Sequence, residues 1–272
     1  MSKLTRSPSV PASRLAWHNG QVQAGTRVVP DETPVALTYN RATLAVMLAT
    51  PSDLEDFAVG FSLTEGIIEH PDQIEELSLV EAAGGIELRM WLPADRAAIA
   101  EQRRRRITGP SGCGLCGIDS LHGALPPVRQ VTAATRLSPD QITAAVNALP
   151  DAQRLNHATH AVHAAAFWHP SHGLLAARED VGRHNALDKL AGALARQRVP
   201  PQDGVLLLSS RLSIELVQKA AALGVGVTVA VSAPTALAIR IADAAGMTII
   251  AVARQDGFEI FTHPKRLKLE TS

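Results

Sequence analysis

The sequence predicts a two-part α/β protein, in which a C-terminal α/β layer follows a smaller α+β domain. From about residue 157 onward, short apolar strands alternate with helical segments of about a dozen residues, a pattern typical of a sheet with parallel strands. Before residue 131 the strand-like segments come in pairs around one amphipathic helix. We therefore expect an α+β domain at 21–130 and an α/β domain at 131–272, after a tail at 1–20 that we expect to be disordered.

Several segments of the N-terminal domain have recognisable patterns. Residues 27–29 and 34–39 predict short strands, while residues 41–49 are too mixed to assign. The segment 51–68 predicts a helix, because Ser52 and Glu55 form a capping-box pattern and apolar residues recur on one face up to Gly66. Residues 74–92 alternate like a hairpin that turns at Gly84 and Gly85, and a short helix at 94–102 precedes a cysteine-containing loop at 103–120.

The C-terminal domain is a regular succession of predicted elements. Ser138, Pro139 and Gln141 predict the start of a capped helix, and residues 159–168 and 174–180 predict two strands joined by a turn. A helix is expected at 181–197. Beyond it we expect a strand at 205–210, a helix ending at Gly224, a strand at 225–232, a helix ending at Gly246 and a strand at 247–253.

The composition limits the function classes. Of the residues, 46% are hydrophobic and 19% are charged, and the formal net charge is zero, so charge does not favour nucleic acid or an anionic membrane as a partner. The aromatic content of 3% argues against a base-stacking surface. No apolar run reaches the roughly 18 residues of a membrane span, and the polar N-terminus lacks the apolar core of a secretory signal. We expect a cytoplasmic protein.

The stretch GPSGCGLCG at 109–117 contains both cysteines, Cys113 and Cys116. In a reducing compartment such a pair is catalytic or metal-binding more often than structural. Its glycines allow sharp turns, and cations nearby favour the reactive thiolate. The run of arginines at 103–106 either supplies these cations or is only a solvent-exposed helix end. The sequence leaves both interpretations open.

Three kinds of site compete for the two thiols, namely a zinc site, a disulfide couple and a sulfur carrier. A structural zinc site needs about four ligands, and only the loose cluster His157, His160 and His163 is available to complete it. A zinc deaminase would show H-x-E and P-C-x-x-C, which are absent here. A thioredoxin-like couple would follow a strand of a βαβ unit, whereas the βαβ pattern begins more than forty residues downstream. A reactive loop that carries sulfur as a persulfide remains.

A second group of polar residues falls where predicted strands end and helices begin. The stretch REDVGRHNALDK at 178–189 places Asp180, Arg183, His184 and Asn185 at such a junction, with Asp188 and Lys189 following. SSRLS at 209–213 and SAPT at 232–235 repeat this arrangement. Helix N-termini bind anions, and this edge of an α/β sheet is where ligands bind, although Ser213 and Ser232 also suit simple N-caps. The sequence favours a nucleotide-like ligand here, and Arg183 and Arg211 are the best candidates for phosphates.

These motifs together resemble the FdhD/NarQ family of formate dehydrogenase accessory sulfurtransferases. GCGLCG is similar to that family's C-G-x-C-G loop, and REDVGRHNALDK and the run at 209–242 are similar to its other signatures. The helix FAVGFSLTEGII and the stretch FTHPKRL match as well, so that the resemblance covers about residues 27–268. Two stretches depart from the family pattern. His160 and Ala161 replace the two glycines of a T-G-G-x-H motif, and VARQDG at 252–257 has fewer glycines and basic residues than the family.

The resemblance implies a cytoplasmic homodimer with a cytidine-deaminase-like α/β fold. It implies that Cys113 accepts sulfur from a cysteine desulfurase, that Cys116 assists, and that the sulfur passes to molybdenum in Mo-bis(molybdopterin guanine dinucleotide) to activate formate dehydrogenase. No permanent metal is expected. The residues expected to bind this cofactor are Val252, Ala253, Arg254, Gln255, Asp256, Gly257, His163, Arg183, His184, Asn185, Ser209, Arg211, Ser232 and Thr235.

The hypothesis from the sequence is therefore a sulfurtransferase with a cysteine persulfide intermediate. One alternative is a chaperone that holds the cofactor and docks on formate dehydrogenase without moving sulfur. Such a chaperone needs the polar residues at the strand ends to bind the cofactor, but it does not need the thiols. A second alternative is a zinc-stabilised interaction module, which would purify with stoichiometric zinc.

Overall fold

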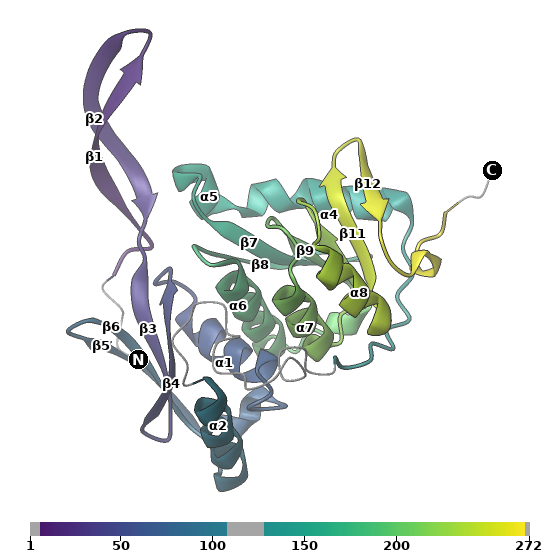
Figure 1. The fold of residues 1–272 in the computed structure, drawn as a ribbon, viewed down its shortest axis with the longest axis horizontal. Coiled ribbons are helices and arrows are strands. Elements are labelled where there is room, and N and C mark those ends of the chain that lie inside the picture. Colours follow the sequence, from purple (N-terminus) through teal and green to yellow (C-terminus); the bar gives the residue numbers. More distant parts are fainter. Residues whose placement is uncertain (1–5, 108–127, 270–272) are drawn as a thin grey trace.

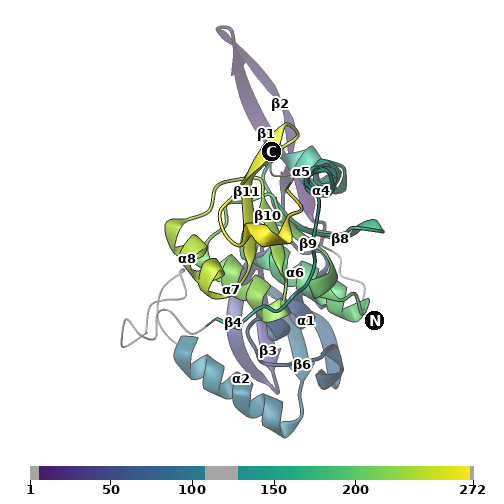
Figure 2. The ribbon, with the colours of Figure 1, turned by 90° about the vertical axis from the view of Figure 1, so that its right-hand side faces the viewer.

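The computed structural model describes residues 6–107 and 128–269, which form three sheets (Figure 1). The first is a two-stranded antiparallel arm, formed by β1 (Ser9–His18) and β2 (Gln21–Pro30). It projects away from the rest of the molecule in both views (Figures 1 and 2). The prediction of a disordered tail at 1–20 is therefore wrong for residues 9–18, and the predicted strand at 27–29 is the end of a longer one.

The turn of the arm explains why this segment forms a hairpin. Asn19 and Gly20 connect the strands with φ angles of 51° and 82°, and Asn-Gly is the dipeptide that best tolerates two successive positive φ values in a two-residue turn. Pro11 is accommodated because each strand of a two-stranded ribbon has a free edge. The polar, proline-containing sequence conceals this turn signal.

The second sheet belongs to the N-terminal part and has four strands in the order β4-β3-β6-β5. Strands β3 and β6 are parallel, and the other neighbours are antiparallel. The hairpin predicted at 74–92 is confirmed. Helices α1 and α2 pack on this sheet around a core that includes Val35, Leu37, Phe57 and Leu88. The elements are β3 (Thr33–Tyr39), β4 (Ala42–Ala49), α1 (Leu54–Thr64), the 3₁₀ turn Pro71–Gln73, β5 (Glu76–Ala82), β6 (Gly85–Trp91) and α2 (Ala94–Ile107).

Two helix boundaries here differ from the prediction. Helix α1 begins after Asp53, which has a left-handed backbone and makes no side-chain cap, so the capping box of Ser52 with Glu55 is wrong. Glu55 instead pairs with Arg196 of α6 (Arg183–Arg196). Helix α2 continues to Ile107 and takes in the basic run that we expected to lie beyond it.

The third sheet has six strands in the order β12-β11-β10-β9-β7-β8. The prediction of parallel strands is correct for β9, β10 and β11, but β7 is antiparallel to both neighbours and β12 is antiparallel to β11. The C-terminal elements are α4 (Pro139–Ala152), α5 (Arg154–Thr159), β7 (His163–His169), β8 (Gly173–Asp180), α6 (Arg183–Arg196), β9 (Val205–Leu208), α7 (Ile214–Leu223), β10 (Val227–Ala230), α8 (Ala236–Ala244), β11 (Thr248–Arg254) and β12 (Gly257–Ile260), with 3₁₀ turns at Pro201–Asp203 and Pro264–Arg266.

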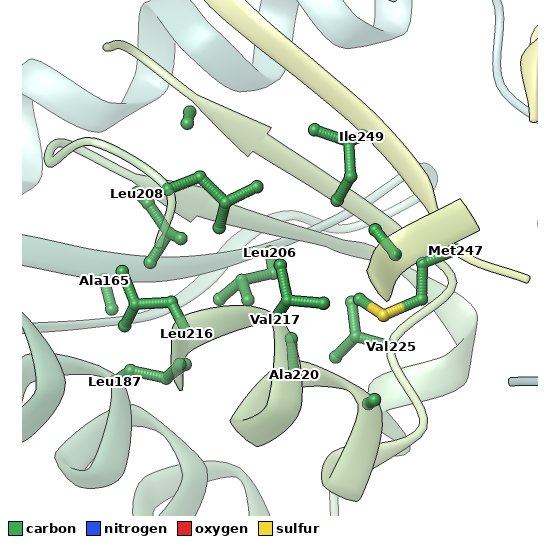
Figure 3. Close-up of a cluster of buried hydrophobic side chains, with 14 of the residues drawn as sticks. Ala165, Leu187, Leu206, Leu208, Leu216, Val217, Ala220, Val225, Met247 and Ile249 are labelled. Carbon is green, nitrogen blue, oxygen red and sulfur yellow. The ribbon is translucent and has the colours of Figure 1, made fainter. Parts of the chain in front are cut away.

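Helices cover both faces of this sheet, which is why its central strands are apolar throughout. Leu206 and Leu208 of β9 face α6, α7 and α8 in the larger core shown in Figure 3. Val205 and Leu207 point the other way and pack with Ile142 of α4. The predicted cap of α4 is confirmed, since Ser138 and Gln141 exchange side-chain and backbone hydrogen bonds.

The start of the sheet differs from the strand predicted at 159–168. Residues up to Thr159 belong to the short helix α5, and His160 ends it with a left-handed φ of 54°. Strand β7 begins only at His163. The three histidines of the loose cluster therefore lie on a helix, a helix cap and a strand, and not on one strand.

Backbones of α1 and α6 approach each other closely and hold the two parts together. A methyl group added at Gly60 would lie 1.7 Å from the carbonyl oxygen of Asp188, and one added at Gly192 would lie 1.9 Å from that of Asp56. The carboxylate of Asp56 also binds Arg178 at 2.7 Å and Arg196 at 2.6 Å. The two helices thus meet through glycine, with ion pairs beside the contact.

Candidate functional site: the carboxyl edge of the six-stranded sheet

The thiols Cys113 and Cys116 lie outside the described residues, but the helix that leads toward them is described. On α2, Arg103 binds the carboxylate of Glu65 at the end of α1, and Arg104 binds Glu101 at 2.8 Å. Arg105 lies 3.4 Å from the same Glu101. These three arginines therefore pair with carboxylates, which limits the field that they add beyond the helix.

The strand ends singled out by the sequence lie along one edge of the six-stranded sheet. Strands β8, β9 and β10 run in the same direction, and the loops after β9 and β10 are joined by hydrogen bonds between Leu212 and both Ala233 and Thr235. The amide of Val252 on β11 donates to the carbonyl oxygen of Ser232 at 3.4 Å. From β8 to β11 this edge spans about 19 Å, at about 4.8 Å per strand.

Some of the predicted ligand residues are committed to the fold. The amide nitrogen of Asn185 donates to the carbonyl oxygen of Leu48 at 2.8 Å and to Asp180 at 3.0 Å. The fully buried ammonium of Lys189 lies 2.7 Å from Asp180 and donates to the carbonyl oxygen of Thr50 at 2.9 Å. Burial lowers the pKa of Lys189, while Asp180 opposes this shift. These bonds join α6 to the end of β4, so Asn185 is not available to a ligand in this arrangement.

Other buried polar atoms at the same edge lack a well-formed hydrogen bond in the described part of the chain. Within the described residues, Arg183 Nε, His184 Nε2, Ser213 Oγ and Glu215 Oε2 make no hydrogen bond of normal geometry. They lie at the N-termini of α6 and α7, and His184 Nε2 is 3.9 Å from Glu215 Oε2. Because buried polar atoms are normally paired, these four groups mark the place where a ligand or a small rearrangement would add hydrogen bonds.

The electrostatics of this cluster keep its histidine neutral. Burial, together with the nearby charges of Arg183 and Lys219, lowers the pKa of His184 to about 4. His163 lies opposite Asp180 in the sheet. Burial and the charge of Arg183 also lower the pKa of His163. The structure therefore brings His163, Arg183 and His184 together as two neutral imidazoles beside one permanent cation, which suits an anionic ligand.

A buried ion cluster lies one helical turn further along the same two helices. Lys219 of α7 binds Asp188 of α6 at 2.9 Å and Glu65 at 3.0 Å, and it also donates to Thr64 at 3.0 Å. Burial alone raises the pKa of Glu65, but the charges of Lys219 and Arg103 outweigh it and lower the pKa to about 2. The cluster links α1, α6, α7 and the end of α2.

The hydroxyl groups at the other strand ends have structural partners. Ser209 Oγ accepts a hydrogen bond from the amide of Ala164 at 2.8 Å, and Thr235 Oγ1 caps α8 by accepting from Ala238 at 3.2 Å. The prediction that Ser232 is an N-cap is therefore wrong, because Thr235 has that position. Ser213 is at the N-cap position of α7 but makes no side-chain cap. Arg211 is exposed.

The predicted cofactor-binding stretch 252–257 forms the end of β11 and its turn into β12. Residues 254–257 are exposed, and Arg254 donates to the carbonyl oxygen of Val231. The register shifts between Ala251 and Arg254, and Val252 has a φ of 51°. A β-branched residue rarely adopts a positive φ, so this bulge holds the backbone of Val252 in a strained conformation beside Ser232.

The described part of the chain has neither a metal-binding cluster nor a membrane-spanning helix. Among residues 6–107 and 128–269, no three or more His, Cys, Asp or Glu side chains gather as a metal site. None of the helices in those ranges is both long and apolar enough to cross a membrane.

Comparison with known proteins identifies the family. A profile of the FdhD/NarQ family matches residues 30–268. Sulfur carrier protein FdhD from Agrobacterium fabrum is 50% identical over 94% of this chain and 95% of its own length, and the same-named protein of Brucella abortus is 50% identical over 93% and 94%. The chain belongs to the FdhD/NarQ family. The resemblance found in the sequence motifs is thereby confirmed.

The fold is also similar to that of a solved structure. The crystal structure of a proposed formate dehydrogenase accessory protein from Desulfotalea psychrophila superposes with a TM-score of 0.73 at 23% identity, covering 96% of this chain and 100% of that chain. At this identity the similarity concerns the fold alone. It supports a mixed α/β architecture for this FdhD/NarQ chain.

The fold places three more charged residues of this FdhD/NarQ chain at the site, and the sequence motifs do not indicate them. Glu215 and Lys219 lie one turn apart on α7, and Glu65 follows α1. Their spacing on α7 was the only available signal, because a helical separation of four residues puts both side chains on one face. That this face meets Asp188 and His184 depends on how α6 and α7 pack.

Proposed function

We propose that this chain is a sulfur carrier that delivers persulfide sulfur to a molybdenum cofactor for formate dehydrogenase. The observation that carries the proposal is the similarity along nearly the whole chain to sulfur carrier proteins FdhD, in a sequence whose two cysteines are spaced C-x-x-C. In the sequence, residues 113 and 116 follow α2 and precede the α/β layer.

The proposed chemistry begins at Cys113. Its thiolate attacks the terminal sulfur of a cysteine desulfurase persulfide, so that a new S–S bond forms on Cys113 and the desulfurase thiolate leaves. Delivery of this sulfur as sulfide requires two electrons. Attack of the Cys116 thiolate on the inner sulfur of Cys113 supplies them, because it forms a disulfide and releases the outer sulfur. A cellular dithiol then reduces the disulfide.

The proposed acceptor is Mo-bis(molybdopterin guanine dinucleotide), bound as a substrate along the carboxyl edge of the six-stranded sheet. In this proposal Arg183 and Arg211 bind phosphate oxygens, and the helix N-termini beside His184 and Ser213 support it because they favour an anion. The exposed turn at 254–257 and the adjacent Ser232 border the far end of this edge. Its length of about 19 Å suits a dinucleotide better than a single phosphate.

We further propose where the protein works, how it assembles, which fold its C-terminal half has and which partners it binds. The protein works in the cytoplasm, forms a homodimer, and has a cytidine-deaminase-like layer in its C-terminal half. A mixed sheet with helices on both faces supports that layer. Its partners are a cysteine desulfurase and formate dehydrogenase, without nucleic acid or membrane.

Mass spectrometry tests sulfur transfer directly. After incubation with a cysteine desulfurase and cysteine, the peptide that contains Cys113 is expected to gain the mass of one sulfur atom. Cys113→Ala should abolish this gain, and cells with that variant should make formate dehydrogenase without activity. Full formate dehydrogenase activity in Cys113→Ala cells would show that the protein is a cofactor-binding chaperone instead, and stoichiometric zinc in the purified protein would favour an interaction module.

A further inference from the structure

The β1–β2 arm has one apolar face that nothing in the described chain covers. Side chains directly opposite in the register share a face. The pair Trp17 with Val22 is followed on this face by Leu15 with Ala24 and then by Ser13 with Thr26. The side chains of this face, which we call the arm face, are Pro11, Ser13, Leu15, Trp17, Val22, Ala24, Thr26 and Val28.

The exposure of the arm face is large for a two-stranded ribbon. Leu15 is 75% exposed, Trp17 is 69% exposed and Val22 is 67% exposed. An isolated hairpin is marginally stable in water, and a third strand or a packed surface is needed to hold it. A side-chain hydrogen bond from Arg27 to the carbonyl oxygen of Thr159 joins the arm to the body at the base of the arm. The arm therefore needs a covering surface.

A second exposed apolar surface lies on β4. Outside the arm, the large hydrophobic residues that the described chain exposes are Val46, Leu48 and Leu269. Val46 and Leu48 are two residues apart on an edge strand, so they share one face. Strand β4 contains no charged residue, and the arm face contains none either, whereas Arg14 and Arg27 lie on the opposite face of the arm. The two apolar surfaces match in chemistry.

The arm points away from its own β4 in both views (Figures 1 and 2), so a second copy is the occupant that the geometry favours. An arm about 33 Å long, from ten residues at about 3.3 Å each, is long enough to reach a neighbouring molecule. When each copy packs its arm on β4 of the other copy, the arm face and the β4 surface of both chains are covered. A two-fold dimer requires this kind of reciprocal contact.

We propose that the arm face of one copy packs on Val46 and Leu48 of a second copy, and that the reciprocal contact closes a two-fold dimer. This deepens the homodimer of the proposed function by naming its surfaces. The contact reaches the candidate site, because Leu48 accepts the hydrogen bond of Asn185 at the start of α6. The arm of one copy then lies at the rim of the other copy's strand edge.

Sedimentation equilibrium of matched variants tests the proposal. Trp17→Thr with Val22→Thr keeps a high strand propensity but removes the apolar contact, and it should raise the dimer dissociation constant at least about 100-fold. The control changes the neighbouring pair on the opposite face, Ala16→Thr with Gln23→Thr, and should change the constant less than about threefold. Far-UV circular dichroism verifies that both variants fold.

A second variant and a mixture identify the receiving surface. Val46→Thr with Leu48→Thr should be as monomeric as the arm variant. When the two variants are mixed, one arm and one β4 surface remain intact in a mixed dimer, so dimers should reappear although neither variant forms them alone. Independent arms that pack on each other would give no such recovery.

Three results would overturn the proposal. They are a wild-type chain that is monomeric at micromolar concentration, an arm variant that dimerises like the control, or a β4 variant that dimerises like wild type. A wild-type monomer whose arm becomes protected only with formate dehydrogenase would assign the arm to that partner. Persulfide loading of Cys113 is measured in the same samples, so failure of the dimer contact is distinguished from failure of sulfur transfer.

Discussion

At the scale of single residues, the candidate site contains polar atoms that the fold leaves unpaired. Within the described residues, Arg183, His184, Ser213 and Glu215 each have a buried atom that makes no hydrogen bond of normal geometry. The sequence indicated Arg183 and His184, since both follow a strand end. It did not indicate Glu215 as a neighbour of His184, because this contact depends on the packing of α6 against α7 and not on any local pattern.

His184 should make stability depend on pH. Its pKa falls from the ordinary 6.5 to about 4 on folding, so between these values the unfolded chain binds a proton that the folded chain does not. The free energy of unfolding is therefore unaffected by the protonation of His184 above pH 6.5. It falls by at most about 3 kcal/mol as the pH decreases toward 4.

Urea unfolding at several pH values between 4 and 7 measures this effect. His184→Gln should lose less stability than wild type over that range. The groups that face His184 are Arg183 on its own helix, Glu215 and Lys219 on α7, and Glu65 after α1. Parallel pH profiles for wild type and variant would contradict the assignment of this proton to His184.

At the scale of elements, the α1–α6 contact is the most sensitive point of the fold. Because the atoms nearest to Gly60 and Gly192 are backbone atoms, they cannot move aside as a flexible side chain does. Gly60→Ala or Gly192→Ala should therefore lower the free energy of unfolding by about 3 kcal/mol or more through overpacking. Chemical denaturation measures the loss.

The matched control for this prediction is Gly84→Ala in the β5–β6 turn. A methyl group at Gly84 meets no atom within 4 Å, and the φ of Gly84 is not in the left-handed range. We expect a change below about 1 kcal/mol. Equal losses at Gly60 and Gly84 would contradict the assignment of the effect to the helix contact.

The elements themselves were predictable to different degrees. Buried strands such as β9 and β10, and helices with clear ends at Gly224 and Gly246, follow from local apolar runs and caps. The antiparallel direction of β7 was not predictable, because the residues of one strand do not specify its neighbour. Asn19 and Gly20 give a turn signal for the arm, but the polar, proline-containing sequence around them is also typical of a disordered tail.

At the scale of the whole molecule, the two sheets are joined through buried polar bonds as well as through α1 and α6. Asp180 accepts from the amide of Thr50 at 3.0 Å and pairs with Lys189, which also binds the carbonyl oxygen of Thr50. Since this junction lies between the N-terminal and C-terminal cores, we expect the two parts to unfold together.

The three tryptophans allow this to be measured. Trp17 lies in the arm, Trp91 in the N-terminal sheet and Trp168 in the C-terminal sheet. In variants that retain only Trp91 or only Trp168, the fluorescence transition in urea should coincide with the far-UV circular dichroism transition. Lys189→Met leaves Asp180 buried without its cation and should cost about 3–5 kcal/mol. Separate transitions for the two tryptophans would show that the sheets unfold independently.

The arm also affects how the chain is made. Arg27 precedes Thr159, its hydrogen-bond partner at the base of the arm, by 132 residues. At a synthesis rate of about 5–20 residues per second, roughly 7–26 s pass between the two. During this interval the base of the arm lacks its hydrogen-bond partner, while Leu15, Trp17 and Val22 are exposed, as they are in the completed chain. Slow synthesis lengthens this interval, so we expect a holding chaperone to bind the nascent arm more when translation is slow than when it is fast.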